Sequence, residues 1–378
     1  MNPSLSIIIP TKDRYSTLIP VLKGLSKDFK NLDIEIIVQD NSEKNDPILQ
    51  FLSDLNCPKI KYFHYANPIP VTENCDKAIL NSMGEYLIMI GDDDFVLPSI
   101  MENLEWMVLN KVDCLNSNTA VYNWPDITSK YNTYSSKSST LFINSPITKK
   151  YEYINPKKEL LKVASSGATG IYNLPRLYHG IVKRTVLESI YRKCRTYFPG
   201  PSPDMANSVA LACSINSFAM VKFPFSISGK SKSSTSGMGA NHQHVGKLEN
   251  IPFLDKKLIK NWDPKIPYIW TGSTIWAQSF VSSLNFFEIN ISLNYFKLYA
   301  NLLIFESGII PIIKKTILYS LKSNPANFLI LIFYSFSQFC YRSLNYILRK
   351  LQIRKKCLVF YDISEIQACK EIIESNNH

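Results

Sequence analysis

Three consecutive aspartates, Asp92, Asp93 and Asp94, are the residues whose type and spacing indicate chemistry most clearly. Adjacent carboxylates repel one another when they are ionised, and a hard divalent cation relieves that repulsion. Mg²⁺ or Mn²⁺ prefers oxygen ligands and is typically held by one or two carboxylates together with substrate phosphates. We therefore predict that Asp92 and Asp94, as a D-x-D, hold Mn²⁺ or Mg²⁺ against a diphosphate. The alternative is a solvated acidic turn that only ends a strand.

The aspartates follow the last of four short apolar runs that alternate with helical patterns. The runs are 5–9, 34–38, 59–65 and 86–90, and helices are expected near 18–29, 46–55 and 72–83. Apolar runs without clean alternation are typical of strands buried on both faces of a parallel sheet. The order predicts an α/β fold with an open, Rossmann-like, mostly parallel central sheet flanked by helices.

Polar residues also follow the three other predicted strands, in the segments 10–14, 39–42 and 66–68. Ligands of open α/β sheets bind beyond the carboxyl ends of the strands, so these groups are expected to converge there. The first predicted strand is not followed by G-x-G-x-x-G, which disfavours a dinucleotide-binding fold. The absence of G-x-x-x-x-G-K-[ST] excludes a P-loop.

The segments Ser6–Arg14, Glu35–Ser42 and Gly84–Asp94 resemble the nucleotide-binding half of family 2 glycosyltransferases with the GT-A fold, of the bacterial O-antigen or capsular polysaccharide type. The likeness covers roughly the first hundred residues, and the three motifs stand in the family's order. It implies a metal-dependent, inverting transfer of a sugar from a nucleoside diphosphate sugar, first of all a UDP-sugar, to a hydroxyl of a glycan acceptor.

The resemblance also implies roles for single residues. Asp40 would accept a hydrogen bond from the base, Asp92 would lie near the ribose, and Asp94 would hold the metal. Many members carry Ala-Arg-Asn on the helix before the D-x-D strand, where this chain has Glu73-Asn74-Cys75, so the donor contact from that helix is open. The predicted donor-binding residues are Pro10, Thr11, Asp13, Asp40, Asn67, Asn74, Asp92 and Asp93.

Simpler interpretations exist for several of these residues. Asp40 would then only shape the turn after its strand, Asp13 would be a helix N-cap, and Lys12 and Arg14 would be solvated.

An inverting transfer also needs a base that removes the proton of the acceptor hydroxyl. The candidate is Asp204, which follows a proline-stiffened loop (Gly200–Pro203) at the start of an apolar helix expected over 205–213. The family places its base in a comparable position. The alternative is that Asp204 is the N-cap of this helix, in which case its carboxylate oxygens would accept backbone hydrogen bonds instead of the proton. Glu188 is a weaker candidate for the base.

The glycine- and serine-rich stretch 228–239 predicts a flexible loop that orders over a bound donor, with Lys230 or Lys232 at the diphosphate. A plain linker is the alternative. His242 and His244 follow as an H-x-H. In related enzymes a histidine beyond the acceptor half completes the metal shell, so His244 is predicted as a third metal ligand. A neutral surface pair is the alternative.

The net charge of +11 is concentrated in one C-terminal segment. Residues 307–361 contain nine basic and no acidic residues around the uncharged, aromatic stretch 326–341. The strongly apolar part of that stretch is too short for a helix that crosses a membrane. Its aromatic residues and basic flanks are typical of a helix that lies in the interface of an anionic membrane. An ordinary core helix is the alternative. Nucleic acid is a less favoured partner because no recognised nucleic-acid-binding fold surrounds the basic residues.

We therefore divide the chain into a nucleotide-sugar-binding half (1–100), an acceptor-binding half (101–245) and a basic, amphipathic helical region (246–378). The eight cysteines are scattered without a C-x-x-C, and no signal-peptide pattern opens the chain. We expect reduced thiols and a cytoplasmic protein, peripheral on the inner face of the cell membrane, with a lipid-linked saccharide acceptor. The two rival functions are a nucleotidyltransferase acting on a sugar phosphate and a non-catalytic, membrane-associated scaffold.

Overall fold

Four parallel strands and three helices form the N-terminal part of the fold. The computed structural model describes residues 3–118, 120–127, 137–144, 147–234, 245–251, 254, 260–323, 327–350 and 357–376. The strand order β3-β2-β1-β4 is fully parallel, and Leu5 pairs with both Ile34 and Tyr86. These elements are β1 (Leu5–Thr11), α1 (Tyr15–Asp28), β2 (Ile34–Asp40), α2 (Asp46–Leu55), β3 (Ile60–His64), α3 (Val71–Leu80) and β4 (Tyr86–Met89).

The same sheet continues beyond β4 with strands of mixed direction. β10 (Gly180–Lys183) is antiparallel to β4 and to β6 (Cys114–Ser117). β11 (Phe218–Val221) is parallel to β6, and β9 (Tyr151–Tyr153) closes the edge in the antiparallel sense. The predicted α/β class with a central, helix-flanked sheet is confirmed, but only half of the eight-stranded sheet is the predicted parallel repeat. The helices of this part are α4 (Ile100–Leu109), α5 (Pro156–Ser165), α6 (Arg184–Cys194) and α7 (Pro203–Ser214).

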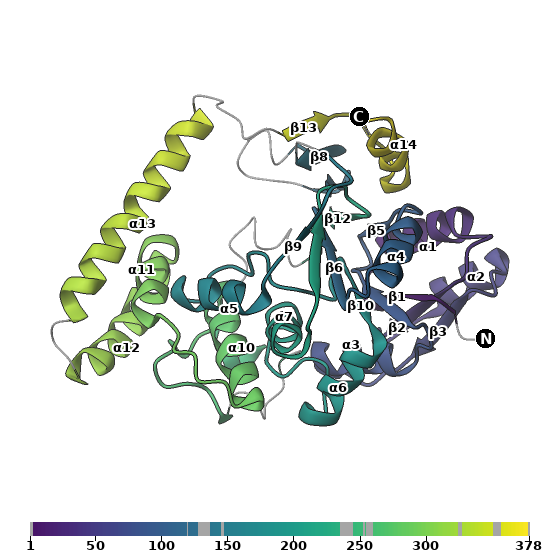
Figure 1. Cartoon of the computed structure of the whole chain (residues 1–378). Coiled ribbons are helices and arrows are strands. Elements are labelled where there is room, and N and C mark those ends of the chain that lie inside the picture. The colour runs from purple at the N-terminus through teal and green to yellow at the C-terminus, as the bar shows by residue number, and fades with distance from the viewer. Residues whose placement is uncertain are drawn as a thin grey trace.

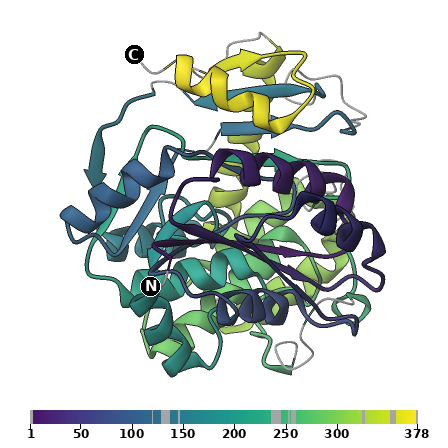
Figure 2. The same ribbon diagram turned by 90° about the vertical axis from the view of Figure 1, so that its right-hand side faces the viewer.

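A second, five-stranded sheet lies above the first in the view of Figure 2. Its order is β13 (Cys357–Phe360), β8 (Thr140–Asn144), β7 (Ala120–Asn123), β12 (Ser226–Lys230) and β5 (Phe95–Val96). β6 and β7, which are close together in the sequence, therefore belong to different sheets. The partner of β8 at the edge of this sheet, β13, comes from the C-terminal region.

The C-terminal region is not helical throughout, which corrects the sequence prediction. After its long helices it returns to the second sheet as β13, and α14 (Cys369–Ser375) follows, with Lys370 in an ion pair with Asp28 of α1. In the described part of this region, 3-10 turns lie between the larger elements at η2 (Leu248–Asn250), η3 (Ser307–Ile309) and η4 (Ile366–Ala368).

Four helices of this region pack beside α5 and α7 and share one apolar core with them. Figure 1 shows α13 as a long helix at the margin of the molecule, beside α11 and α12. Leu331 of α13 is buried in this core, whereas most large apolar side chains of α13 are exposed. Within the described residues, none of the helices has the length and apolar character needed to cross a membrane. The helices are α10 (Gly272–Phe287), α11 (Tyr295–Phe305), α12 (Ile310–Ser323) and α13 (Asn327–Lys350).

Candidate functional site

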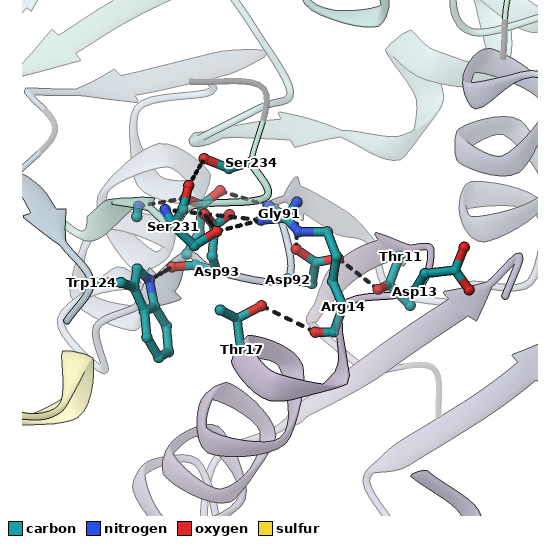
Figure 3. A network of polar contacts seen from close by, with 12 residues as sticks. Thr11, Asp13, Arg14, Thr17, Gly91, Asp92, Asp93, Trp124, Ser231 and Ser234 are labelled. Carbon is teal, nitrogen blue, oxygen red and sulfur yellow. Dashed lines mark hydrogen bonds and ion pairs between the residues drawn. The ribbon is translucent and has the colours of Figure 1, made fainter. Parts of the chain in front are cut away.

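The three aspartates form a buried turn directly after β4, and Arg14 neutralises two of them. Arg14 Nη1 lies 2.7 Å from Asp92 Oδ1, and Arg14 Nη2 lies 3.0 Å from Asp93 Oδ2 (Figure 3). The hydroxyl of Thr11 donates to Asp92 Oδ2 at 2.6 Å. The alternative interpretation of Arg14 as a solvated side chain does not fit these contacts, because segments far apart in the sequence place its guanidinium between two carboxylates.

Asp93 also ties the turn to the segment after β12. Its Oδ2 accepts hydrogen bonds from the backbone N–H and the hydroxyl of Ser231, at 3.0 and 2.8 Å, and its carbonyl accepts one from Trp124 Nε1 at 2.8 Å. Gly229 allows this approach, since a Cβ at that position would collide with the carbonyl oxygen of Asp93. A side chain at position 229 would therefore push β12 away from the turn.

Asp94 points toward the other half of the sheet, and its contacts are also internal. Its Oδ2 accepts hydrogen bonds from the N–H of Gly91 and the phenol of Tyr178, both at 2.6 Å, and its Oδ1 accepts one from the N–H of Gly229 at 2.7 Å. His179 Nε2 lies 3.2 Å from Asp94 Oδ2. The turn is thus held from three sides by protein donors.

Burial and charge act differently on these carboxylates. Burial raises the pKa of Asp92 and of Asp93, with repulsion between the aspartates acting in the same direction and Arg14 opposing it. Burial also raises the pKa of Asp94, but His179 and the hydrogen bond from Tyr178 outweigh it, so that the net effect lowers this pKa. Asp94 is therefore the aspartate whose charge the protein itself stabilises best.

The predicted metal ligands do not form a ready metal site. Among the residues that the structure describes, no three His, Cys, Asp or Glu side chains are grouped so as to hold a metal ion. Asp92 and Asp93 contact Arg14, and Asp94 would have to give up hydrogen bonds to bind a cation. The side chains as placed therefore do not fit Mn²⁺ or Mg²⁺. His242 and His244 lie outside the described residues, and metal dependence stays a prediction.

Asp204 lies on the wall of a cavity of about 180 Å³ next to this turn, in the first turn of α7. Ser202 takes the N-cap position instead, so the N-cap interpretation of Asp204 is wrong. The carboxylate forms no hydrogen bond or ion pair with another described residue. Burial raises the pKa of Asp204, against the opposing effects of His179 and Arg176. The oxygens of Asp204 are therefore available to a ligand.

His179 connects the cavity to the aspartate turn. It lines the cavity with Asp204, its Nδ1 lies 3.1 Å from the hydroxyl of Ser226, and its Nε2 faces Asp94. Its backbone has φ of 61°, in the left-handed region that non-glycine residues seldom adopt. Such strain persists where surrounding contacts hold it and clusters at functional sites. The sequence carried no local signal for His179, because only the fold brings it to Asp94.

The remaining predicted donor residues lie at the same sheet edge in different settings. Pro10 and Thr11 end β1, while Asp13 and Asn67 are exposed. Asp13 has φ of 56°, and Arg14 rather than Asp13 stands at the N-cap position of α1.

Two predicted donor residues are instead buried in internal networks. Asp40 accepts hydrogen bonds from the hydroxyls of Tyr15, Tyr62 and Ser42, at 2.6–2.7 Å. Asn74 donates to the carbonyls of Thr11 and Gln39, both at 3.3 Å. As placed, Asp40 and Asn74 hold the strand ends together, so the simpler interpretation of Asp40 fits its contacts better.

The predicted flexible loop at 228–239 begins as regular structure. Residues up to Lys230 belong to β12, which pairs with β5 and β7, and burial lowers the pKa of Lys230. Lys232 is exposed. Residues 235–239 lie outside the described residues, so the predicted ordering over a donor is untested.

Comparison with known families agrees with this geometry. Residues 6–170 match the model of the family described as "Glycosyl transferase family 2". The match includes β1 through the aspartate turn and continues past α5. It supports the predicted resemblance of the first part of the chain to this family, and it extends that resemblance beyond the first hundred residues to residue 170.

One curated relative is the "Putative colanic acid biosynthesis glycosyl transferase WcaA" of Escherichia coli (strain K12). It is 34% identical over 99 residues, which make up 26% of this chain and 35% of that protein. The chain thus spans about a third of the length of the relative that it matches. Among solved structures, S. aureus TarS 1-349 in complex with UDP-GlcNAc has a TM-score of 0.45 at 16% identity, covering 62% of this chain and 60% of that one. TarS 1-349 without that ligand gives 0.43 at 16% identity, with 61% and 60% covered.

Proposed function

We propose that this protein is an inverting glycosyltransferase that moves a sugar from a nucleoside diphosphate sugar to a hydroxyl of a glycan acceptor. The observation that carries the proposal is the convergence of Asp204 with the aspartate turn. Asp204 comes from α7 and Asp94 from the loop after β4, yet His179 contacts Asp94 and lines the same cavity as Asp204. The family match over residues 6–170 supports the reaction class.

The reaction is a single displacement at the anomeric carbon. The acceptor oxygen attacks that carbon, its proton passes to the carboxylate of Asp204, and the bond to the phosphate oxygen breaks, so that the nucleoside diphosphate leaves with the electron pair. A carboxylate within reach of the hydroxyl contributes about 10²–10⁴-fold to such a step. The raised pKa of Asp204 suits this task, because it makes the carboxylate a stronger base than an exposed one.

The residues at the sheet edge bind and orient the donor. Arg14 offsets the negative charge of Asp92 and Asp93, which reduces the repulsion that a diphosphate would meet there. Thr11 fixes Asp92 from β1, and Tyr178 fixes Asp94 from the loop before β10. This arrangement holds the donor edge rigid while the acceptor enters from the Asp204 side.

A panel of nucleotide sugars tests the proposal. UDP-, GDP- and dTDP-sugars, each with and without Mn²⁺, are screened for thermal stabilisation, since a ligand that binds only the folded chain raises Tm. Donors that stabilise the protein are then assayed for release of nucleoside diphosphate. Pyrophosphate exchange with a nucleoside triphosphate and a sugar phosphate would indicate the nucleotidyltransferase instead. An absence of turnover with every donor would favour the scaffold.

We further propose that α13 binds the inner face of the cell membrane and brings the protein to a lipid-linked acceptor. Leu331 packs α13 onto the core, whereas Phe333, Phe336 and Phe339 are 57–68% exposed. Lys314 and Lys315 of the neighbouring α12 are exposed as well. Aromatic side chains beside lysines suit an interface with anionic lipid, where each basic residue near the surface contributes about 1 kcal/mol.

Vesicle sedimentation tests this second proposal. Replacing Phe333, Phe336 and Phe339 together with serine should abolish binding to phosphatidylglycerol vesicles. The matched control is Leu109→Ser, which removes an 81% exposed apolar side chain from α4 and should leave binding unchanged. Equal binding of the triple variant and the wild type would contradict the proposal.

A further inference from the structure

The cavity beside Asp204 contains polar groups that the described part of the protein leaves without partners. Arg176 Nε and the hydroxyl of Ser208 are buried and have no hydrogen-bond partner. Both residues line the cavity with Asp204. The guanidinium of Arg176 forms no ion pair with a described residue, although it lies close enough to Asp204 for the two charges to influence each other.

Such groups destabilise the folded chain unless something binds them. A buried donor without a partner costs about 1–3 kcal/mol, and more when it is charged. Unsatisfied groups of this kind are few in native proteins, and each calls for an explanation. Arg176 and Ser208 come from different elements and meet at one cavity, so a common ligand explains both.

The chemistry of the three groups defines that ligand. Arg176 can only donate hydrogen bonds, through a planar fork that matches carboxylate and phosphate oxygens. The Ser208 hydroxyl can donate as well, whereas the ionised Asp204 can only accept. The ligand must therefore present one hydroxyl and, beside it, oxygen atoms that accept hydrogen bonds from a cation.

We propose that this cavity selects an acceptor sugar that carries an oxyanion, either a phosphate or a carboxylate, close to the reacting hydroxyl, with Arg176 as the specificity-determining residue. The proposal rests on the glycosyltransferase function, because it takes Asp204 as the group that meets the acceptor hydroxyl. A sugar linked through its phosphate to a lipid and a uronic acid both present this chemistry.

The donor's own diphosphate is a poorer partner for Arg176. In an inverting displacement, the base and the leaving diphosphate lie on opposite faces of the transferred sugar. Arg176 shares its cavity with Asp204, the proposed base, and the carboxylate whose charge acts on it is Asp204 and none of the three aspartates of the turn. We therefore place Arg176 on the acceptor side. The cavity's volume of about 180 Å³ is also small beside the roughly 300–1,000 Å³ of typical ligand pockets, so an additional nucleotide fits it poorly.

Binding of simple sugar probes tests the proposal without any turnover. The dissociation constants of glucose 1-phosphate, glucuronate, methyl glucoside and UDP are measured by ligand-observed NMR on the full chain. The wild type should bind at least one anionic sugar at least tenfold more tightly than methyl glucoside. The anionic sugar that binds more tightly shows whether the natural ligand carries a phosphate or a carboxylate. Arg176→Gln should abolish this preference and leave UDP affinity unchanged.

Two further variants make the result specific. Arg192→Gln removes an exposed guanidinium from α6 and should keep the full preference. Ser208→Ala, which breaks no hydrogen bond within the described part of the chain, should weaken the anionic probe at least threefold. It also keeps the test valid if Arg176→Gln does not fold.

Three results would overturn the proposal. They are equal binding of anionic and neutral sugars by the wild type, an unchanged preference in Arg176→Gln or Ser208→Ala, and a loss of UDP affinity in Arg176→Gln. In each case UDP binding and nucleotide-sugar turnover by the wild type would still support the proposed function, so the two failures can be told apart.

Discussion

The aspartate turn and the Asp204 cavity are neighbours, but the polar groups of the turn are paired with protein groups, whereas three polar groups of the cavity are not paired within the described part of the chain. In the turn, Arg14 contacts two carboxylates and Asp94 accepts hydrogen bonds through both of its oxygens. In the cavity, Asp204, Arg176 and Ser208 make no side-chain hydrogen bond to one another or to another described residue. The turn is therefore built to keep its shape, and the cavity is built to receive a group that supplies the missing partners.

The largest loss of stability is expected from Asp94→Ala. The substitution leaves the phenol of Tyr178 and the N–H groups of Gly91 and Gly229 without their acceptor. Removing one member of a buried, paired cluster costs about 3–5 kcal/mol. Urea unfolding measures the change, and Asp54→Ala, at an exposed position, should stay within about 0.5 kcal/mol. Equal stability of the two variants would mean that the turn is not held as described.

A smaller loss is expected from Arg14→Gln, because Arg14 is 20% exposed and water screens part of its charge. We expect a loss of roughly 2–3 kcal/mol, below the range for a fully buried pair. Arg192→Gln is the charge-matched control. If Arg14 were solvated, as in the simpler interpretation of the sequence, both arginine variants would unfold at the same urea concentration.

The two serines compare the regions directly. Ser231→Ala removes a hydroxyl that donates to Asp93 and accepts from Arg14, and should cost about 1.5 kcal/mol. Ser208→Ala removes a buried hydroxyl without a partner among the described residues and should not lower the free energy of unfolding. It should raise it, by up to about 1–3 kcal/mol, because the cost of the unpaired donor is removed. A lower Tm for Ser208→Ala than for Ser231→Ala would contradict the distinction between the turn and the cavity.

The pH dependence of stability gives the subtlest effect. Burial raises the pKa of Asp204 in the folded chain, so its stabilising contribution is complete below the unfolded pKa of about 3.9 and is lost as pH rises through the raised value. Asp204→Asn cannot ionise. Its Tm should therefore exceed that of the wild type above the raised pKa, and the difference should shrink as the pH is lowered from 8 toward the unfolded pKa of about 3.9. A difference that stays constant down to pH 4 would contradict the raised pKa.

Local sequence predicted the parallel half of the fold well, because β1, β2 and β4 are continuous apolar runs. It failed where distant segments decide the structure. The polar residues Asn116 to Thr119 separate the apolar positions of β6 and β7, but nothing local shows that these strands belong to different sheets, or that β13 pairs with a strand more than two hundred residues earlier.

The same limit applies to the site. The aspartate turn and Asp204 were predicted because each follows a recognisable strand or loop. The ion pairs of Arg14 were not predicted, because its partners Asp92 and Asp93 lie about eighty residues away in the turn after β4. Arg176 and His179 carry no local pattern, and only the packing of β10 beside β4 places them at the cavity.

The most direct test of the account is the rate of nucleoside diphosphate release by Asp204→Asn, with the donor identified in the panel and an acceptor that the wild type uses. The account predicts a fall in kcat of about 10²–10⁴-fold with donor affinity unchanged and Tm no lower than that of the wild type, while Asp54→Asn keeps full activity. Near-full turnover by Asp204→Asn would contradict the central claim that this carboxylate takes the proton of the acceptor hydroxyl.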